Sequence, residues 1–226
     1  IQTDITTFSI KEVQGFSAPS VDSPLGAFKL VENVGGTFRN ISRNTAKLAS
    51  ALDYSASFRV KPNGRNWVVL TLSDGTAGNR AEQYFDITNG VKGTSASFGT
   101  FVFKNSTITS LSGGYFDISV TATSGTELVV KTALSLAEAD NDTNYTGDGT
   151  SGVYIFGAQL EQNSSATSYI PTAGTIISRT ADSASKSGIS SLIGQTEGVL
   201  YAEISALADD STIRAISLSD GTTSNF

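Results

Sequence analysis

The sequence predicts an all-β protein, a jelly-roll β-sandwich followed by the first strands of a second β-sandwich. Three observations lead to this fold class. Short strand-like runs recur along the chain, turn sequences separate them, and little of the chain has the composition of a helix. Roughly ten strands without crossover helices fit a sandwich or jelly roll far better than an α/β fold.

The expected strands follow one another at short intervals. Several have the period-two alternation of a half-buried strand, with Phe116, Ile118 and Val120 on one side of the chain. The run from Trp67 to Leu72 is apolar on both sides, as expected for a central strand of two packed sheets. In chain order the expected strands are residues 8–13, 27–34, 37–42, 54–60, 67–73, 82–87, 99–103, 115–122, 128–136 and 152–160.

The segments between these runs carry residues that reverse the chain. Proline fixes φ, whereas glycine and asparagine accept the positive φ that tight hairpin turns require. The expected turns are residues 22–26, Pro62-Asn63-Gly64, Asp74-Gly75, Asn89-Gly90, Gly113-Gly114 and Ser124-Gly125.

Composition excludes several classes of function. The chain has no cysteine and no histidine, which removes disulfides, thiolate and imidazole metal ligands, and serine–histidine nucleophile pairs. The net charge is −6 and no basic stripe is present, so nucleic acid is not an expected partner. No apolar stretch approaches the roughly 20 residues that span a bilayer, so membrane insertion is not expected.

A repeat links the middle of the chain to its last residues. The string LSDGT at residues 72–76 recurs at residues 218–222, and Asn79 recurs as Asn225 at the same offset. The alternation before the two strings also matches, which favours a reused structural unit over a common turn string. The second copy stops just past its turn, and a lone hairpin is marginally stable in water.

This repeat suggests how the chain is divided into domains. In the first copy, Tyr54, Phe58 and Leu70 are expected to face inward. The segment after Leu160 is polar and then rich in serine and alanine, as expected for a connector, and we place the domain boundary near Ser187. The expected organisation is a jelly-roll domain over residues 1–187, with a connector over residues 172–190, and an incomplete second sandwich over residues 191–226.

The end of the first domain carries a long motif. Residues 149–162 read GTSGVYIFGAQLEQ, residues 166–172 read ATSYIPT, and residues 179–182 read RTAD. This ending resembles a module found in bacteriophage tail and virion proteins, whose members resemble jelly-roll carbohydrate-binding modules and often precede a laminin-G or concanavalin-like sandwich. The resemblance extends over residues 27–182, and Phe156 stands where the family motif usually has tryptophan.

The resemblance implies a function outside catalysis. It points to a virion component at the particle surface, part of a tail fibre or receptor-binding appendage that contacts host-surface glycan. Its partners would be other virion proteins and that glycan, and it would assemble as a homo-oligomer such as a trimer. Two alternatives stay open: a structural spacer or capsid decoration module, and an accessory module of a polysaccharide depolymerase whose catalytic part lies outside these residues.

Glycan recognition predicts particular residue types. An aromatic ring presents a flat apolar face to a sugar, and amides, carboxylates and guanidinium groups bond its hydroxyls. A single tryptophan in a sandwich is more often part of the core, so a structural role is the alternative for it. The candidates for carbohydrate binding are Trp67, Tyr84, Asn66, Arg80, Asp86 and Tyr115.

One acidic loop has part of the pattern of a calcium site. From Asp140 onward, oxygen-bearing side chains stand at alternate positions, as in a calcium-binding loop. The sixth position is Tyr145 instead of glycine and the twelfth is Ser151 instead of glutamate, so the EF-hand pattern fails. Asp140, Asp142 and Asp148 remain weak candidates for a structural calcium, and no other cofactor is expected.

Paired carboxylates for glycoside hydrolysis are not expected in this chain. Glu82 and Asp86 lie four residues apart on one expected strand, which separates them by about 13 Å on the same face. Both hydrolytic geometries require a shorter separation. We therefore expect no catalytic residues among these positions.

Overall fold

The computed structural model describes residues 9–12, 27–35 and 39–170. The chain divides into two units, Ile1–Pro171 and Thr172–Phe226, and all of the described residues belong to the first. Within them the chain forms two antiparallel sheets, so the predicted β-sandwich is confirmed. The expected second sandwich and the expected boundary near Ser187 lie outside the described residues.

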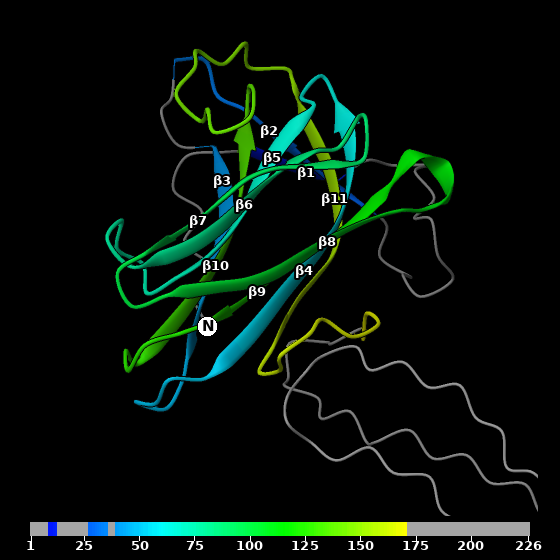
Figure 1. Ribbon diagram of the computed structural model, residues 1–226. Helices are drawn as coiled ribbons and strands as arrows, with labels where there is room; N and C mark the ends of the chain where they lie inside the picture. The colour runs from blue at the N-terminus through cyan, green and yellow to red at the C-terminus, as the bar shows by residue number, and fades with distance from the viewer. Residues whose placement is uncertain (1–8, 13–26, 36–38, 171–226) are drawn as a thin grey trace, which may run out of the picture. The chain divides into compact units, whose positions relative to one another are not determined.

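Eleven strands and one short 3₁₀ turn make up the described unit (Figure 1). One sheet has six strands in the order β1-β2-β11-β4-β9-β8, and the other has five in the order β3-β10-β5-β6-β7. The elements are β1 Ser9–Glu12, β2 Phe28–Val31, β3 Asn40–Ala46, β4 Asp53–Asn63, β5 Trp67–Ser73, β6 Arg80–Asp86, β7 Val91–Phe98, β8 Val102–Ser110, η1 Ser112–Gly114, β9 Phe116–Thr123, β10 Val129–Ala137 and β11 Gly152–Glu161.

The strand order is that of a jelly roll. Four strands of each sheet, β2-β11-β4-β9 and β3-β10-β5-β6, give the eight strands of two interleaved Greek keys. Strands β7 and β8 extend the two sheets at the same side of the sandwich, and β1 extends the six-stranded sheet at its other edge. The earliest strands pair with the latest, β2 with β11 and β3 with β10, so neither sheet is complete until the whole unit has been assembled.

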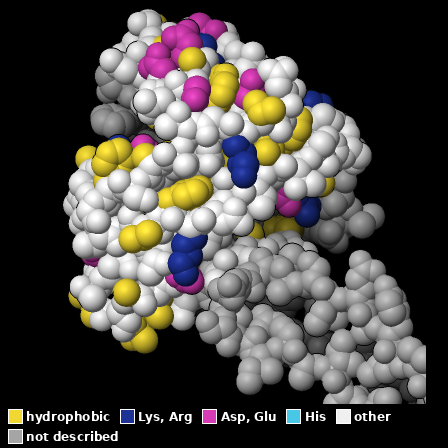
Figure 2. Space-filling model, viewed as in Figure 1, with side chains coloured by type: hydrophobic (Ala, Val, Ile, Leu, Met, Phe, Trp, Pro, Cys, Tyr) yellow, Lys and Arg dark blue, Asp and Glu magenta, His cyan; other side chains and the backbone are white. Residues whose placement is uncertain are grey.

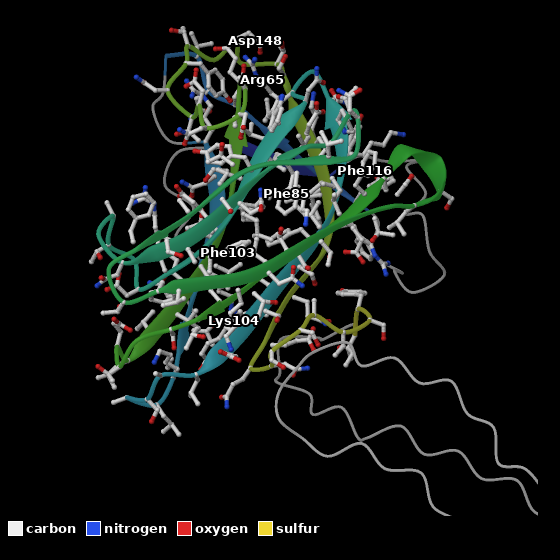
Figure 3. The ribbon with its side chains drawn as sticks, in the orientation of Figure 1. Arg65, Phe85, Phe103, Lys104, Phe116 and Asp148 are labelled. Carbon is white, nitrogen blue, oxygen red and sulfur yellow. The ribbon has the colours of Figure 1, made fainter. Side chains whose placement is uncertain are left out.

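The space between the sheets is filled by alternating apolar side chains. Tyr54, Phe58 and Leu70 all lie in this core, as the sequence predicts, and none is more than 5% exposed. Phe85, labelled in Figure 3, is fully buried among them. At roughly 25 cal/mol for each Å² of apolar surface removed from water, this core is the main source of the stability of the unit.

Three strands differ most from the sequence prediction. Strand β7 was not expected, because its sequence VKGTSASF has almost no apolar alternation and most of its residues are exposed. Strand β8 begins at Val102, later than expected, because Gly99 adopts a positive φ of 61° and turns the chain beside Asn79. Strand β3 begins at Asn40 and ends at Ala46, four residues beyond the expected end.

No membrane-crossing helix occurs within residues 9–12, 27–35 and 39–170. The only helical element there is the three-residue η1 turn.

Candidate functional site

The five-stranded sheet carries a small apolar cluster on the face that points away from the core. Val68, Leu70 and Leu72 of β5 face the other sheet, so the alternating residues of β5 lie on the opposite side, here termed the outer face. Val69, Tyr84 and Ala137 pack together there, and Trp67 packs against them. Two of the predicted aromatic candidates, Trp67 and Tyr84, therefore belong to one surface.

Strand register places the remaining outer-face residues in rows across the sheet. Trp67 lies opposite both Ala137 and Asp86, and Val69 lies opposite Tyr84. The next two rows are polar except for Ala133. They comprise Ala133, Thr71 and Glu82, followed by Lys131, Ser73 and Arg80.

The two aromatic residues differ in accessibility. Trp67 is partly exposed, whereas Tyr84 is only 6% exposed. The hydroxyl of Tyr84 is hydrogen bonded to Thr143 in the loop after β10, and burial raises the pKa of this phenol. Of these two aromatic residues, Trp67 therefore retains the more exposed surface.

Arg80 and Asp86 lie on the same face but already have partners. Arg80 donates from Nε to Glu82 at 2.8 Å, and its guanidinium stacks 3.7 Å from the centroid of the Phe98 ring. Asp86 accepts hydrogen bonds from the backbone N–H groups of Thr88 and Asn89, at 2.9 and 3.1 Å. These turn bonds outweigh the effect of burial and lower the pKa of Asp86. Asp86 thus organises the β6–β7 turn.

Asn66 and Tyr115 are not brought onto this face. Asn66 is exposed just before β5, where its carbonyl accepts a hydrogen bond from Ile87 N at 2.8 Å. Tyr115 directly precedes β9 of the six-stranded sheet and is 1% exposed, so its ring presents no face to solvent. Burial raises the pKa of the Tyr115 phenol far above its usual value.

The three aspartates considered for calcium serve different turns. Asp140 accepts hydrogen bonds from Thr94, and Asp142 accepts one from Asn144 N at 2.8 Å. Asp148 accepts bonds from the side chain and the backbone of Ser151, which hold the pKa of Asp148 well below its usual range. No group of three or more potential acidic ligands converges in the described part of the chain. Figure 2 shows acidic side chains gathered at the end of the sandwich where Figure 3 labels Asp148.

A buried ionic cluster at this end of the sandwich was not predicted from the sequence. Glu32, whose side chain is fully buried, accepts two hydrogen bonds from Arg65, at 2.6 and 2.7 Å. Glu32 also accepts bonds from Tyr145 Oη at 2.9 Å and from Asp148 N at 2.7 Å. Its carboxylate therefore joins three segments of the chain that are distant in the sequence.

Two arginines enclose the tyrosine of this cluster. The guanidinium of Arg39 lies 3.8 Å from the centroid of the Tyr145 ring, and that of Arg65 lies 4.4 Å from it. Arg39 also donates to the carbonyl of Tyr145. Glu32 directly follows β2, and no local sequence pattern links it to Arg65 or Tyr145.

The family-like motif at the end of β11 folds back on itself. Gln159 accepts a hydrogen bond from Ile170 N at 2.7 Å, and Glu161 accepts one from Thr167 N at 2.8 Å and another from Thr167 Oγ1 at 2.7 Å. Residues 159–170, here termed the clasp, are thus closed by their own side chains. Tyr169 packs against Phe156, with ring centroids 5.3 Å apart.

A glycine makes the clasp possible. Gly157 adopts a positive φ of 60° at the point where β11 slips in register against β4. A Cβ at this position would lie 3.4 Å from the Tyr169 ring. Arg59 lies over both Phe156 and Tyr169, at 5.7 and 5.5 Å from their centroids. The residues of GAQLE and SYI therefore hold the clasp closed in this chain, through the glycine, the two hydrogen-bonding side chains and the tyrosine ring.

Comparison with known proteins adds no family. No protein-family model matches the chain, and no curated protein matches it.

Proposed function

We propose that this chain is a non-catalytic virion component, part of a phage tail fibre or receptor-binding appendage, whose jelly roll contacts glycan on the host surface. The observation that carries the proposal is the outer face, on which the partly exposed Trp67 and the row of Thr71 and Glu82 lie on either side of the Val69–Tyr84 row, within the span of an oligosaccharide. An indole face and nearby hydroxyl and carboxylate groups are the chemistry that saccharides require. The resemblance of residues 149–182 to phage modules supports the virion part of the proposal.

The same face supports binding without hydrolysis. Glu82 is paired with Arg80, and Asp86 is held in the β6–β7 turn, so both carboxylates have structural partners. A single shallow contact of this kind binds weakly. Several copies in a homo-oligomer such as a trimer, held on the particle by other virion proteins, would raise the apparent affinity through avidity.

The test is a glycan array, followed by host-cell binding, with the intact oligomer. We expect Trp67→Ala to abolish binding and Thr71→Ala to weaken it about tenfold, the equivalent of roughly one hydrogen bond. Tyr115→Phe, on the other sheet and buried, is the matched aromatic control and should bind normally. Circular dichroism confirms that each variant is folded. Binding that survives both outer-face substitutions would contradict the proposal.

A structural spacer is the second candidate, and the burial of two aromatics favours it. Tyr84 and Tyr115 are 6% and 1% exposed, so neither presents its ring to solvent in this structure. A spacer would bind other virion proteins and no saccharide. A folded oligomer that captures virion proteins but binds neither the glycan array nor host cells would support this function.

A further inference from the structure

A short loop lies over the aromatic part of the outer face. Residues 139–144, here termed the lid, follow the end of β10 and reach β7, where Asp140 contacts Thr94. Strands β5 and β6 lie between β10 and β7 in the sheet, so the lid passes across both. On the way Thr143 is hydrogen bonded to the hydroxyl of Tyr84. The lid therefore covers part of the outer face.

One aspartate closes the lid. Asp140 accepts a hydrogen bond from Thr94 N at 2.7 Å through Oδ1, and one from Thr94 Oγ1 at 2.9 Å through Oδ2. Strand β7 slips in register against β6 at this point, where Gln83 Nε2 donates to the carbonyl of Gly93 at 2.7 Å. These two bonds between Asp140 and Thr94, here termed the latch, fasten the lid to β7. Both depend on the single carboxylate of Asp140.

Gly93 allows the latch to close directly against the indole. A Cβ on Gly93 would lie 2.7 Å from both Asp140 Cγ and Trp67 Cζ3, closer than real Cβ atoms approach other atoms. The backbone of β7, the latch carboxylate and one edge of the indole therefore meet at this point. When the latch is closed, this edge of Trp67 is hidden from a ligand.

The lid is fixed at its two ends and polar in between. At one end, Glu138 donates its N–H to Asp142 O at 2.9 Å and lies 3.8 Å from Arg65. At the other end, Tyr145 is buried in the ionic cluster. Between them the sequence ADNDTN has no apolar side chain larger than alanine. Opening breaks the exposed bonds of Asp140 and the bond from Thr143 to Tyr84, and the lid itself withdraws no large apolar side chain from the sheet, which is typical of a low-stability local unit.

We propose that the lid opens over Trp67 and Tyr84, and that its open form presents the two rings to a pyranose ring of a glycan. The ligand class in this inference rests on the proposed function, whereas the lid itself rests only on the contacts above. Glycan binding and lid closure compete for the same face. The apparent affinity is then the intrinsic affinity reduced by the fraction of molecules whose lid is open.

The chain offers a direct reporter, because Trp67 is its single tryptophan. The experiment compares acrylamide quenching of Trp67 fluorescence in the intact protein, in Asp140→Ala and in Asp74→Ala. Asp74 is the matched control, because it also accepts a backbone N–H, that of Thr76 at 2.7 Å, but at the turn that follows the other end of β5. Both substitutions remove one negative charge.

We expect Asp140→Ala to raise the open population about tenfold, as loss of a charge-assisted hydrogen bond of typical strength would. Quenching of Trp67 should increase and its emission should shift to the red, with Asp74→Ala unchanged. Thr94→Val, which removes one of the two latch bonds, should give an intermediate value.

Measuring glycan affinity distinguishes failure of the lid proposal from failure of the proposed glycan-binding function. If glycan binds, Asp140→Ala should bind up to about tenfold more tightly than the natural protein, because more of it is open. Increased quenching without glycan binding by any form would keep the lid and overturn the proposed function. Unchanged quenching in folded Asp140→Ala, whatever the glycan result, would overturn the lid.

Discussion

At the scale of single residues, Glu32 is a buried charge in the described unit whose hydrogen-bond partners must all be in place. Its side chain is fully buried and carries four hydrogen bonds, two of them from Arg65. A buried charge is costly to leave unpaired, and removing one partner of such a pair typically costs about 3–5 kcal/mol. Residues at this site therefore affect stability far more than the exposed charges of the same chain.

The pKa of Glu32 gives this cluster a defined pH dependence. Burial raises that pKa, but the hydrogen bonds from Arg65, Asp148 N and Tyr145 outweigh burial and hold it below the ordinary value of 4.5. A carboxyl whose folded pKa is depressed stabilises the fold fully above its unfolded pKa. This contribution is lost as the pH falls below 4.5 and through the lower pKa of the folded state.

We predict that Arg65→Met lowers the free energy of unfolding by about 3–5 kcal/mol at neutral pH. The variant should also lose less stability between neutral pH and a pH below 4.5, because burial is then opposed by fewer hydrogen bonds and the pKa of Glu32 rises. Urea unfolding at a series of pH values measures both effects. Arg43→Met, at an exposed position of β3, is the matched control and should change stability by about 0.5 kcal/mol or less. Equal pH dependence in the natural protein and Arg65→Met would contradict this account of Glu32.

At the scale of elements, the clasp determines how β11 ends. Gln159 and Glu161 point back along the chain and hold Ile170 and Thr167, so the last described residues are fastened to the strand that precedes them. All of these bonds are partly exposed, and they involve only the last residues of β11 and the loop that follows it. Such a unit opens locally without unfolding the core.

We predict that Gln159→Leu frees the Ile170 amide, which then exchanges its hydrogen faster. The global free energy of unfolding should fall by only about 1 kcal/mol, because the bonds of Gln159 to Ile170 N, Glu161 and Ser168 are partly exposed and lie in a segment that opens locally. Gln162→Leu, at an exposed neighbouring position, is the matched control. Hydrogen exchange followed by mass spectrometry resolves the segment. Protection at Ile170 that is the same in both variants would show that the clasp is held by the packing of Tyr169 instead of by Gln159.

The sequence predicts best those strands that are packed between apolar side chains. Strand β5 was predicted with its observed bounds, because WVVLTLS is packed on both sides and ends at the Asp74-Gly75 turn. Strand β7 was not predicted, because its sequence has almost no apolar alternation; it pairs with β6 and is also held by the bonds between Thr94 and Asp140, which are distant in sequence. A local pattern carries no information about partners of that kind.

The candidate site follows the same division. Period-two spacing placed Glu82 and Asp86 on one face of the expected strand over residues 82–87. The observed start of β6 at Arg80 and its register with β5 add Arg80 and Trp67 to this face. Tyr115 could not be assigned in this way, because its burial depends on packing at the end of the six-stranded sheet. The Glu32–Arg65 pair escaped detection since 33 residues separate its members.

At the scale of the whole molecule, the jelly-roll order makes the two sheets interdependent. Strand β2 pairs with β11, and β3 pairs with β10, so each sheet combines the beginning and the end of the described unit. All of these strands contribute to one core between the sheets. Folding that depends on such distant pairings is slow, and it is cooperative because no subset of strands buries the core by itself.

We predict that a chain shortened to Ile1–Pro171 unfolds in a single transition, in which far-UV circular dichroism and Trp67 fluorescence change at the same temperature. This chain keeps both sheets and the clasp. A chain ending at Gln162 keeps all of the strands but loses the clasp partners of Gln159 and Glu161, so it should also unfold in one step, at a lower temperature. Two separate transitions in the Ile1–Pro171 chain would mean that the sheets are not energetically coupled. A chain that fails to fold would mean that residues beyond Pro171 contribute to the core, and the unit would then have to be defined with them included.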